Sequence, residues 1–130
     1  MNEKINIGIT GAGGALGKSL TKKFKSKGYK ITGFSHNQFS NSLGESEPDE
    51  WVKWECGKEY LLEDKLKKID ILILNHGVYQ SGIDNTNYQN SIEINALSKL
   101  RLLNIFEEIA INNEDDKKKE IWINTSEAEI

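Results

Sequence analysis

The sequence lacks several features that would point to particular classes of protein. Its 130 residues contain a single cysteine, a single proline and a single methionine. The lone cysteine, Cys56, excludes an internal disulfide and is typical of a reducing compartment. No apolar run approaches the roughly 18 residues that a membrane-spanning helix needs, and residues 1–20 do not have the pattern of a signal peptide. These absences favour a cytoplasmic protein without a membrane partner.

An excess of positive charge is also missing. The 17 lysines and arginines are outnumbered by 20 aspartates and glutamates, which gives a formal net charge of -3. This balance speaks against nucleic acid as a partner, because domains that bind it have a strongly basic surface. The residues near Cys56 do not have the spacing of metal ligands, so we predict no metal site. The length suits one domain with a core of its own.

The N-terminal segment carries the strongest functional signal. Isoleucines alternate over residues 5–9 as in a short buried strand, and a glycine-rich turn follows at 11–17. Leu16, Leu20 and Phe24 then recur every four residues, which predicts one buried face of a helix. A strand, a glycine-rich turn and a helix in this order present backbone N–H groups to a phosphate. The segment therefore predicts nucleotide binding.

The rest of the chain alternates predicted strands and helices. Four further strands are expected at 29–34, 51–56, 69–74 and 120–124. Two helices are expected at 59–68 and 88–112. The inner face of the second consists of Ile94, Leu97, Leu100 (or Arg101), Leu103 and Ile109. Alternation of this kind predicts an α/β fold, a doubly wound parallel sheet. Right-handed crossovers favour the strand order 3-2-1-4-5.

Two phosphate-binding motifs overlap in the glycine-rich turn. The strict dinucleotide pattern G-x-G-x-x-G would need glycine at position 16, which is a leucine. A looser dinucleotide spacing is present in Gly11, Gly14 and Gly17, preceded by Thr10. Dinucleotide binding is the interpretation we favour.

The second motif is a relaxed Walker A sequence over residues 12–19. In that interpretation Lys18 would hold the β- and γ-phosphates and Ser19 the magnesium ion. A triphosphate enzyme also needs an aspartate at the end of a later apolar strand, but the strand at 69–74 is followed by Asn75. A Mg-ATP-dependent enzyme therefore stays as the less favoured alternative.

Four landmarks make the chain resemble the short-chain dehydrogenase/reductase family. Residues 10–17 fit the T-G-x-x-x-[AG]-x-G turn of that family, and residues 75–77 are similar to its N-N-A-G stretch. Asn95 falls where the family places a structural asparagine of its proton relay. Residues 121–126 resemble the strand that leads to the catalytic serine, which would make Ser126 that serine.

The resemblance implies a Rossmann-like fold and hydride transfer between a nicotinamide dinucleotide and a carbonyl or alcohol group. The small-molecule substrate cannot be named from the sequence. The residues expected to bind the cofactor lie at the ends of three predicted strands: Thr10, Gly11, Gly13, Gly14, Ala15, Leu16, Gly17, Ser35, His36, Asn75, His76 and Gly77.

The end of the second strand favours NADP over NAD. NAD enzymes of this fold usually place an acid there, which binds the adenosine ribose 2′-hydroxyl. Here Phe34 is followed by Ser35, His36 and Asn37, none of them acidic. Ser35 and His36 can donate hydrogen bonds to a 2′-phosphate, which a carboxylate would repel. We therefore predict NADP(H).

The catalytic Tyr-x-x-x-Lys pair of the family is absent from this sequence. All four tyrosines precede the predicted fifth strand, and none has a lysine four positions later. Asn95 and Ser126 are then members of an incomplete catalytic set, and an ungapped match puts Glu127 in place of the serine. Residues 1–130 are expected to form one Rossmann domain, a cofactor-binding half truncated after strand five and inactive alone. Its uncovered apolar surface predicts marginal stability or a homo-oligomer.

Two further alternatives remain open from the sequence. The chain could be a non-catalytic module that binds a nucleotide and regulates a partner. It could also be a relative of the sugar-nucleotide epimerases, because Gly11, Gly14 and Gly17 have the spacing of that branch. Residues 75–77 and Asn95 favour the dehydrogenase branch instead.

Overall fold

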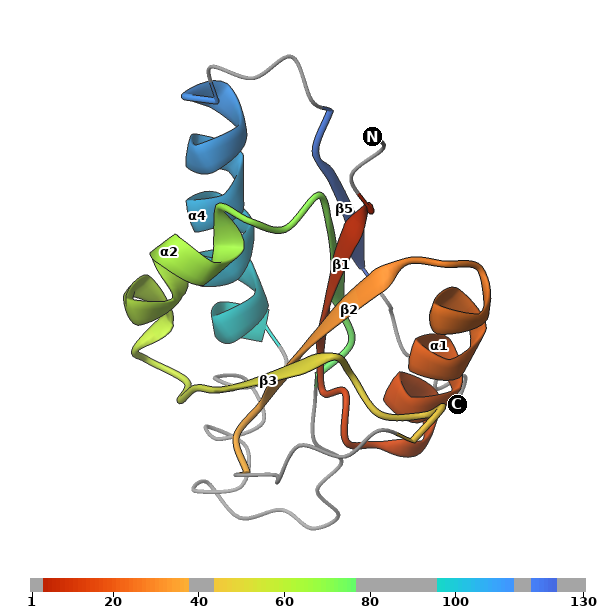
Figure 1. Cartoon of the computed structure of the whole chain (residues 1–130). Coiled ribbons are helices and arrows are strands. Elements are labelled where there is room, and N and C mark those ends of the chain that lie inside the picture. Colours follow the sequence, from red (N-terminus) through yellow and green to blue (C-terminus); the bar gives the residue numbers. More distant parts are fainter. Residues whose placement is uncertain (1–3, 38–43, 77–95, 114–117, 124–130) are drawn as a thin grey trace, which may run out of the picture.

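A five-stranded parallel sheet lies at the centre of the molecule (Figure 1). The computed structural model describes residues 4–37, 44–76, 96–113 and 118–123. The strands are β1 (Asn6–Thr10), β2 (Lys30–Ser35), β3 (Glu50–Lys53), β4 (Ile71–Leu74) and β5 (Glu120–Ile123). Their order is β3-β2-β1-β4-β5, and every neighbouring pair is parallel. The predicted fold class and strand order are confirmed.

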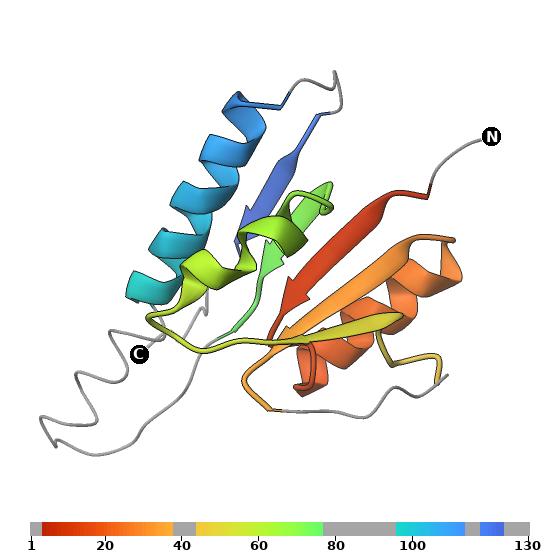
Figure 2. The same ribbon diagram turned by 60° about the vertical axis from the view of Figure 1, so that its left-hand side comes forward.

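Helices cover both faces of the sheet (Figures 1 and 2). One face carries α1 (Ala15–Ser26). The other carries α4 (Ser98–Ile111) and a short segment made of the 3-10 helix η1 (Glu59–Leu62) and α2 (Glu63–Leu66). The helix predicted at 59–68 is therefore two short pieces of different pitch.

The core divides into two clusters, one on each face of the sheet. The cluster under α1 consists of Ile7, Ile9, Ala12, Phe24, Ile31 and Ile73. The cluster under α4 and α2 consists of Phe34, Trp54, Leu62, Leu66, Ile69, Leu72, Leu74, Leu102, Phe106 and Ile109. Successive side chains of β4 enter different clusters, as expected for a central strand covered on both faces.

In two helices the buried face differs in part from the one that the leucine pattern predicts. In α1 the buried residues are Gly17, Thr21 and Phe24. Phe24 is thus buried as predicted and Leu20 is partly buried against the core, but Leu16 is 49% exposed. The reason is that the first turn of α1 packs against the glycine-rich turn, where only a glycine fits. The hydrophobic prediction for Leu16 was therefore wrong.

Helix α4 shows the same kind of difference. Its buried residues are Ser98, Leu102, Phe106 and Ile109, a set spaced by three or four residues. Leu97 and Leu100, predicted for the inner face, are exposed, whereas Ile109 is buried as predicted. This face combines three apolar side chains of the core with the hydroxyl of Ser98, whose polar partners Glu59 and His76 are also buried. Ile94 lies outside the described residues.

Candidate functional site

The glycine-rich turn leads from the carboxyl end of β1 into α1 and is hydrogen-bonded to the carboxyl end of β2. The backbone N–H of Gly11 donates to the carbonyl of Phe34 over 3.0 Å, and the N–H of Gly14 donates to the carbonyl of Gly11 over 3.2 Å. Gly11 has a φ of +65°, in the left-handed region that favours glycine. The chain therefore reverses sharply between β1 and α1, at the edge of the sheet where ligands of such folds bind.

Gly17 makes this turn tight. A Cβ at position 17 would lie 2.4 Å from the carbonyl oxygen of Gly11 and 2.7 Å from Cα of Ala12. A Cβ at Gly14 would meet only the same oxygen, at 3.6 Å, which is ordinary contact. The first turn of α1 thus lies directly against the glycine-rich turn, and the N-terminal N–H groups of α1 are presented at the sheet edge.

Thr10 ties the turn to the end of β4. Its Oγ1 accepts hydrogen bonds from the backbone N–H groups of Asn75 over 2.9 Å and His76 over 3.2 Å. The backbone of His76 also lies against Gly11, where an added Cβ would come within 3.0 Å of its Cα. The structure therefore brings together Thr10, Gly11, Gly17, Asn75 and His76, all of them predicted site residues.

His76 is buried and neutral. Its Nδ1 lies 2.8 Å from Thr10 Oγ1, and its Nε2 lies 3.1 Å from Ser98 Oγ. Burial, together with smaller electrostatic contributions from Lys99 and His36, lowers the pKa of His76 to about 3. The imidazole, predicted as a cofactor contact, thus makes its polar contacts inside the protein.

Glu59 is a member of this site that the sequence did not indicate. It is 1% exposed, and its Oε2 accepts from the backbone N–H of Gly57 over 2.7 Å and from the hydroxyl of Ser98 over 3.4 Å. Arg101 lies 3.4 Å from its Oε1. Buried carboxylates need such partners, but Ser98 and Arg101 lie 39 and 42 residues away in sequence, too far to make a recognisable motif. Only the short Gly57–Glu59 spacing gives a local signal.

Ser35 and His36 lie at the end of β2, one strand away. The hydroxyl of Ser35 accepts from the backbone N–H of Asn37 over 3.1 Å. The ring of His36 is exposed, lies 4.4 Å from the ring of Trp54, and places Nδ1 3.0 Å from the carbonyl of Trp54. Because a carbonyl only accepts, this nitrogen carries the hydrogen.

The remaining predicted residues divide into two groups. Gly13, Ala15 and Leu16 belong to the turn and the start of α1, where the last two are exposed. The Walker residues Lys18 and Ser19 are exposed near the start of α1. Four residues predicted or weighed for the site lie outside the described residues: Gly77, Asn95, Ser126 and Glu127.

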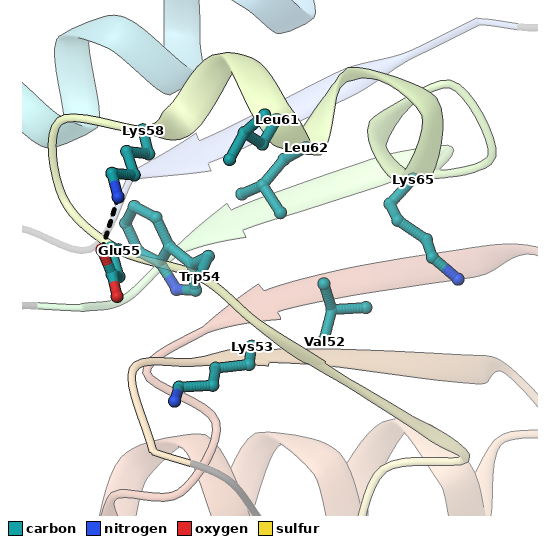
Figure 3. Close-up of a pocket in the computed structure, with 8 residues that line it drawn as sticks. All are labelled: Val52, Lys53, Trp54, Glu55, Lys58, Leu61, Leu62 and Lys65. Carbon is teal, nitrogen blue, oxygen red and sulfur yellow. Dashed lines mark ion pairs between the residues drawn. The ribbon is translucent and has the colours of Figure 1, made fainter.

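A pocket of about 430 Å³ lies between the end of β3 and the η1–α2 segment (Figure 3). Apolar side chains line it together with lysines and one acid, and Lys58 pairs with Glu55 over 3.4 Å. The lining is Val52, Lys53, Trp54, Glu55, Lys58, Leu61, Leu62 and Lys65. None of these residues belongs to the predicted cofactor set. Trp54 connects the two regions, because its ring also lies 5.0 Å from that of His76.

Membrane-spanning helices and metal clusters are both missing from the described parts of the chain. These parts contain no helix that is both long and apolar enough to cross a membrane. Within the same ranges, no group of three or more histidine, cysteine, aspartate or glutamate side chains is arranged to hold a metal ion.

The fold and the turn together define a doubly wound, Rossmann-like α/β domain. The model of the NAD dependent epimerase/dehydratase family matches residues 7–127, so the chain belongs to this family. The predicted resemblance to the short-chain dehydrogenases and reductases is thereby confirmed at the level of the superfamily. Within the superfamily, residues 75–77 and Asn95 had favoured the dehydrogenase branch over the epimerases. The family match corrects this preference. The spacing of Gly11, Gly14 and Gly17 had indicated the epimerase branch.

A curated relative supports the same assignment. The chain is 36% identical over 128 residues to the monoglucosyldiacylglycerol epimerase of Synechocystis sp. (strain ATCC 27184 / PCC 6803 / Kazusa). The aligned region covers 95% of this chain and 31% of that protein. The chain therefore spans about a third of the length of the curated relative it matches.

Solved structures share the fold at low sequence identity. An oxidoreductase of the short-chain dehydrogenase/reductase family from Burkholderia thailandensis is 18% identical, with a TM-score of 0.78 over 94% of this chain and 51% of that one. A short-chain dehydrogenase/reductase superfamily protein from Agrobacterium tumefaciens with bound NAD is 16% identical, with a TM-score of 0.72. The match covers 93% of this chain and 32% of that one. At such identities the likeness establishes the fold.

Proposed function

We propose that this chain binds a nicotinamide dinucleotide at the glycine-rich turn between β1 and α1. The observation that carries the proposal is the close contact of Gly17 with Gly11, which leaves backbone N–H groups and the N-terminus of α1 open toward a pyrophosphate. Membership of a family described as NAD dependent supports it. The NAD bound in the Agrobacterium protein supports it as well.

The preference for NADP(H) is a finer part of the proposal. It is supported by the absence of a carboxylate from residues 35–37 and by the exposed ring of His36 at the end of β2. A 2′-phosphate at this place would meet the ring and no negative side chain among these three residues. The descriptions of the family and of the Agrobacterium protein name NAD, so a direct comparison of the two cofactors is needed.

For the reaction, we propose hydride transfer at a carbon that bears a hydroxyl group on a glycosyl substrate. The support is the Synechocystis relative, whose name describes an epimerase of a glucosyl lipid. Removal of a hydride by the cofactor and loss of the hydroxyl proton to a base give a ketone. Return of the hydride to the opposite side, with return of the proton, inverts that carbon. We assign this reaction to a protein of the length of the relatives, with residues 1–130 supplying the dinucleotide site.

The experiment is a thermal melt of the 130-residue chain alone and with NADPH, NADH or Mg-ATP. A ligand at 100 times its Kd adds roughly 2.7 kcal/mol to the free energy of unfolding, which raises the Tm by several degrees. We expect both dinucleotides to raise the Tm, with the larger shift for NADPH. A larger shift with NADH would reject only the NADP preference.

Lys18→Ala separates this proposal from the Mg-ATP alternative. Lys18 is exposed in the first turn of α1, so its removal leaves the turn intact and the shift with NADPH nearly unchanged. A shift with Mg-ATP that this variant abolishes, with none for either dinucleotide, would reject the proposal in favour of triphosphate binding.

A further inference from the structure

We propose that His76 is a positioning residue, which holds the glycine-rich turn in place relative to helix α4 through a chain of hydrogen bonds from Glu59 to Thr10. The chain runs from the carboxylate of Glu59 to the hydroxyl of Ser98, then to the imidazole of His76 and the hydroxyl of Thr10. The inference rests on the proposed dinucleotide site, because Thr10 and Gly11 are the start of that site. It adds Glu59, Ser98 and His76 as residues that shape the site from behind.

The direction of each hydrogen bond follows from the groups present. The single hydrogen of the Ser98 hydroxyl is donated to Glu59, so Nε2 of His76 must donate to Ser98 Oγ. A neutral imidazole then has Nδ1 as an acceptor. The hydroxyl of Thr10 has two acceptors within reach, the carbonyl of Ile73 at 3.4 Å and this nitrogen at 2.8 Å, and we assign its hydrogen to the nearer one. This leaves the lone pairs of Thr10 Oγ1 for the N–H groups of Asn75 and His76. The network selects the Nε2–H tautomer.

Burial makes each member of the chain depend on the next. His76 is 4% exposed, Ser98 is fully buried and Thr10 is 1% exposed, so water cannot replace a lost partner. The lowered pKa keeps the imidazole neutral, which is the form that can both accept from Thr10 and donate to Ser98. A side chain without both nitrogens would deprive the Ser98 hydroxyl of its donor and the Thr10 hydroxyl of its nearest acceptor.

The geometry links this chain to the shape of the site. Ser98 and Arg101 stand in the first turn of α4, and both contact Glu59. At the other end, the backbone of His76 touches Gly11, and the hydroxyl of Thr10 holds the end of β4. A displacement of the imidazole therefore shifts the turn that would receive the pyrophosphate.

The test compares Ser98→Ala, His76→Phe and the double variant with a matched control. The control is Thr32→Val, which also removes a buried hydroxyl. This hydroxyl donates a hydrogen bond to Asn6 Oδ1 over 3.1 Å and lies away from the site. We expect Ser98→Ala and His76→Phe each to raise the Kd for NADPH about tenfold, a loss comparable to one buried hydrogen bond. Thr32→Val should lower the Tm and leave this Kd within about twofold of the parent value.

Non-additivity distinguishes positioning from general destabilisation. If Ser98 acts through His76, adding Ser98→Ala to His76→Phe causes no further increase in Kd, because the chain is already interrupted. Independent, additive increases, or a Kd unchanged in both single variants, would overturn the proposal.

A second measurement needs no cofactor. Amide NMR spectra should show the Gly11 and Asn75 signals shifted by Ser98→Ala in the parent chain and unshifted by it in His76→Phe. The imidazole ¹⁵N shifts should show hydrogen on Nε2 of His76. Unmoved signals, or hydrogen on Nδ1, would reject the positioning role even if the cofactor binds. A parent chain that binds neither dinucleotide would reject the proposed function, and the NMR result would still decide the role of His76.

Discussion

Gly17 allows the turn to close because it has no side chain. The atoms nearest to a Cβ at this position would be backbone atoms, which cannot move aside without opening the turn. The resemblance to the family includes this glycine, but its physical role is visible only in the contact with Gly11. The same contact explains why Leu16, next to it, points toward solvent.

Substitution of Gly17 tests this contact. We expect Gly17→Ala to lower the free energy of unfolding by about 1–3 kcal/mol, because the methyl group forces the backbone apart. It should also abolish the Tm shift with NADPH. Gly14→Ala is the matched control, since its Cβ would have its nearest neighbour at 3.6 Å, and it should keep most of the stability. Chemical denaturation and calorimetric titration measure both quantities, and equal losses in the two variants would contradict the prediction.

His76 gives stability a defined dependence on pH. Its pKa is about 3 in the folded chain against an ordinary value of 6.5, so the unfolded chain binds the proton more readily between these values. Stability is therefore full above about pH 6.5 and is lost as the pH falls toward 3.

Urea denaturation at pH 7 and pH 5 measures this effect. We expect the free energy of unfolding to fall by about 2 kcal/mol between them because of His76 alone. His76→Gln should remove this part of the pH dependence and leave the part due to other groups. An equal fall in the parent chain and in His76→Gln would show that the imidazole is not the group responsible.

At the scale of elements, α1 and α4 show how packing overrides a leucine pattern. Leu97 and Leu100 both suggested an inner face for α4, yet the buried face starts at Ser98, whose hydroxyl contacts Glu59 and His76, and continues through the apolar core residues of the helix. Most of the stability of such a helix comes from the face that is packed, whichever residues carry it.

A pair of leucines in α4 tests its orientation. Leu102 is fully buried and Leu100 is 51% exposed, and they lie two positions apart in one helix. We expect Leu102→Ala to cost about 2–5 kcal/mol of unfolding free energy. Leu100→Ala should cost under about 0.5 kcal/mol, as exposed substitutions usually do. Similar losses in urea denaturation would mean that α4 is rotated from the orientation described above.

At the scale of the whole molecule, β5 presents apolar side chains at an edge of the sheet. In the described part of the chain β5 pairs with β4 alone, and Trp122 and Ile123 are 44% and 50% exposed. Edge strands with apolar side chains invite pairing with other chains. The predicted homo-oligomer is consistent with this surface and stays a prediction.

Sedimentation velocity at increasing concentration tests that prediction. We expect self-association of the 130-residue chain, and we expect Ile123→Lys to weaken it because a charge would be buried at the edge. Leu61→Lys is the control, since Leu61 is 66% exposed on η1, away from β5. A monomer at all concentrations, or equal effects of the two variants, would reject association through β5.

The parts of the site that could and could not be predicted differ in how far apart in sequence their interacting residues lie. The turn from Thr10 to Gly17 was predicted from a run of eight consecutive residues, and its glycines have the expected place between β1 and α1. The roles of His76 and Glu59 were not predicted. Their partners lie 66 and 39 residues away in sequence, and no periodic pattern joins them.

The sequence by itself determined the class of fold and the place of the turn. Alternating strands and helices and the spacing of Gly11, Gly14 and Gly17 are local patterns, and local sterics and burial impose them on any chain of this type. Only the tertiary structure decided which faces of α1 and α4 are buried and that Glu59, Ser98 and His76 meet behind the turn. Those arrangements depend on close packing between elements, as at Gly17, and on polar groups from separate elements satisfying one another in the core. Both conditions exist only once the elements are packed.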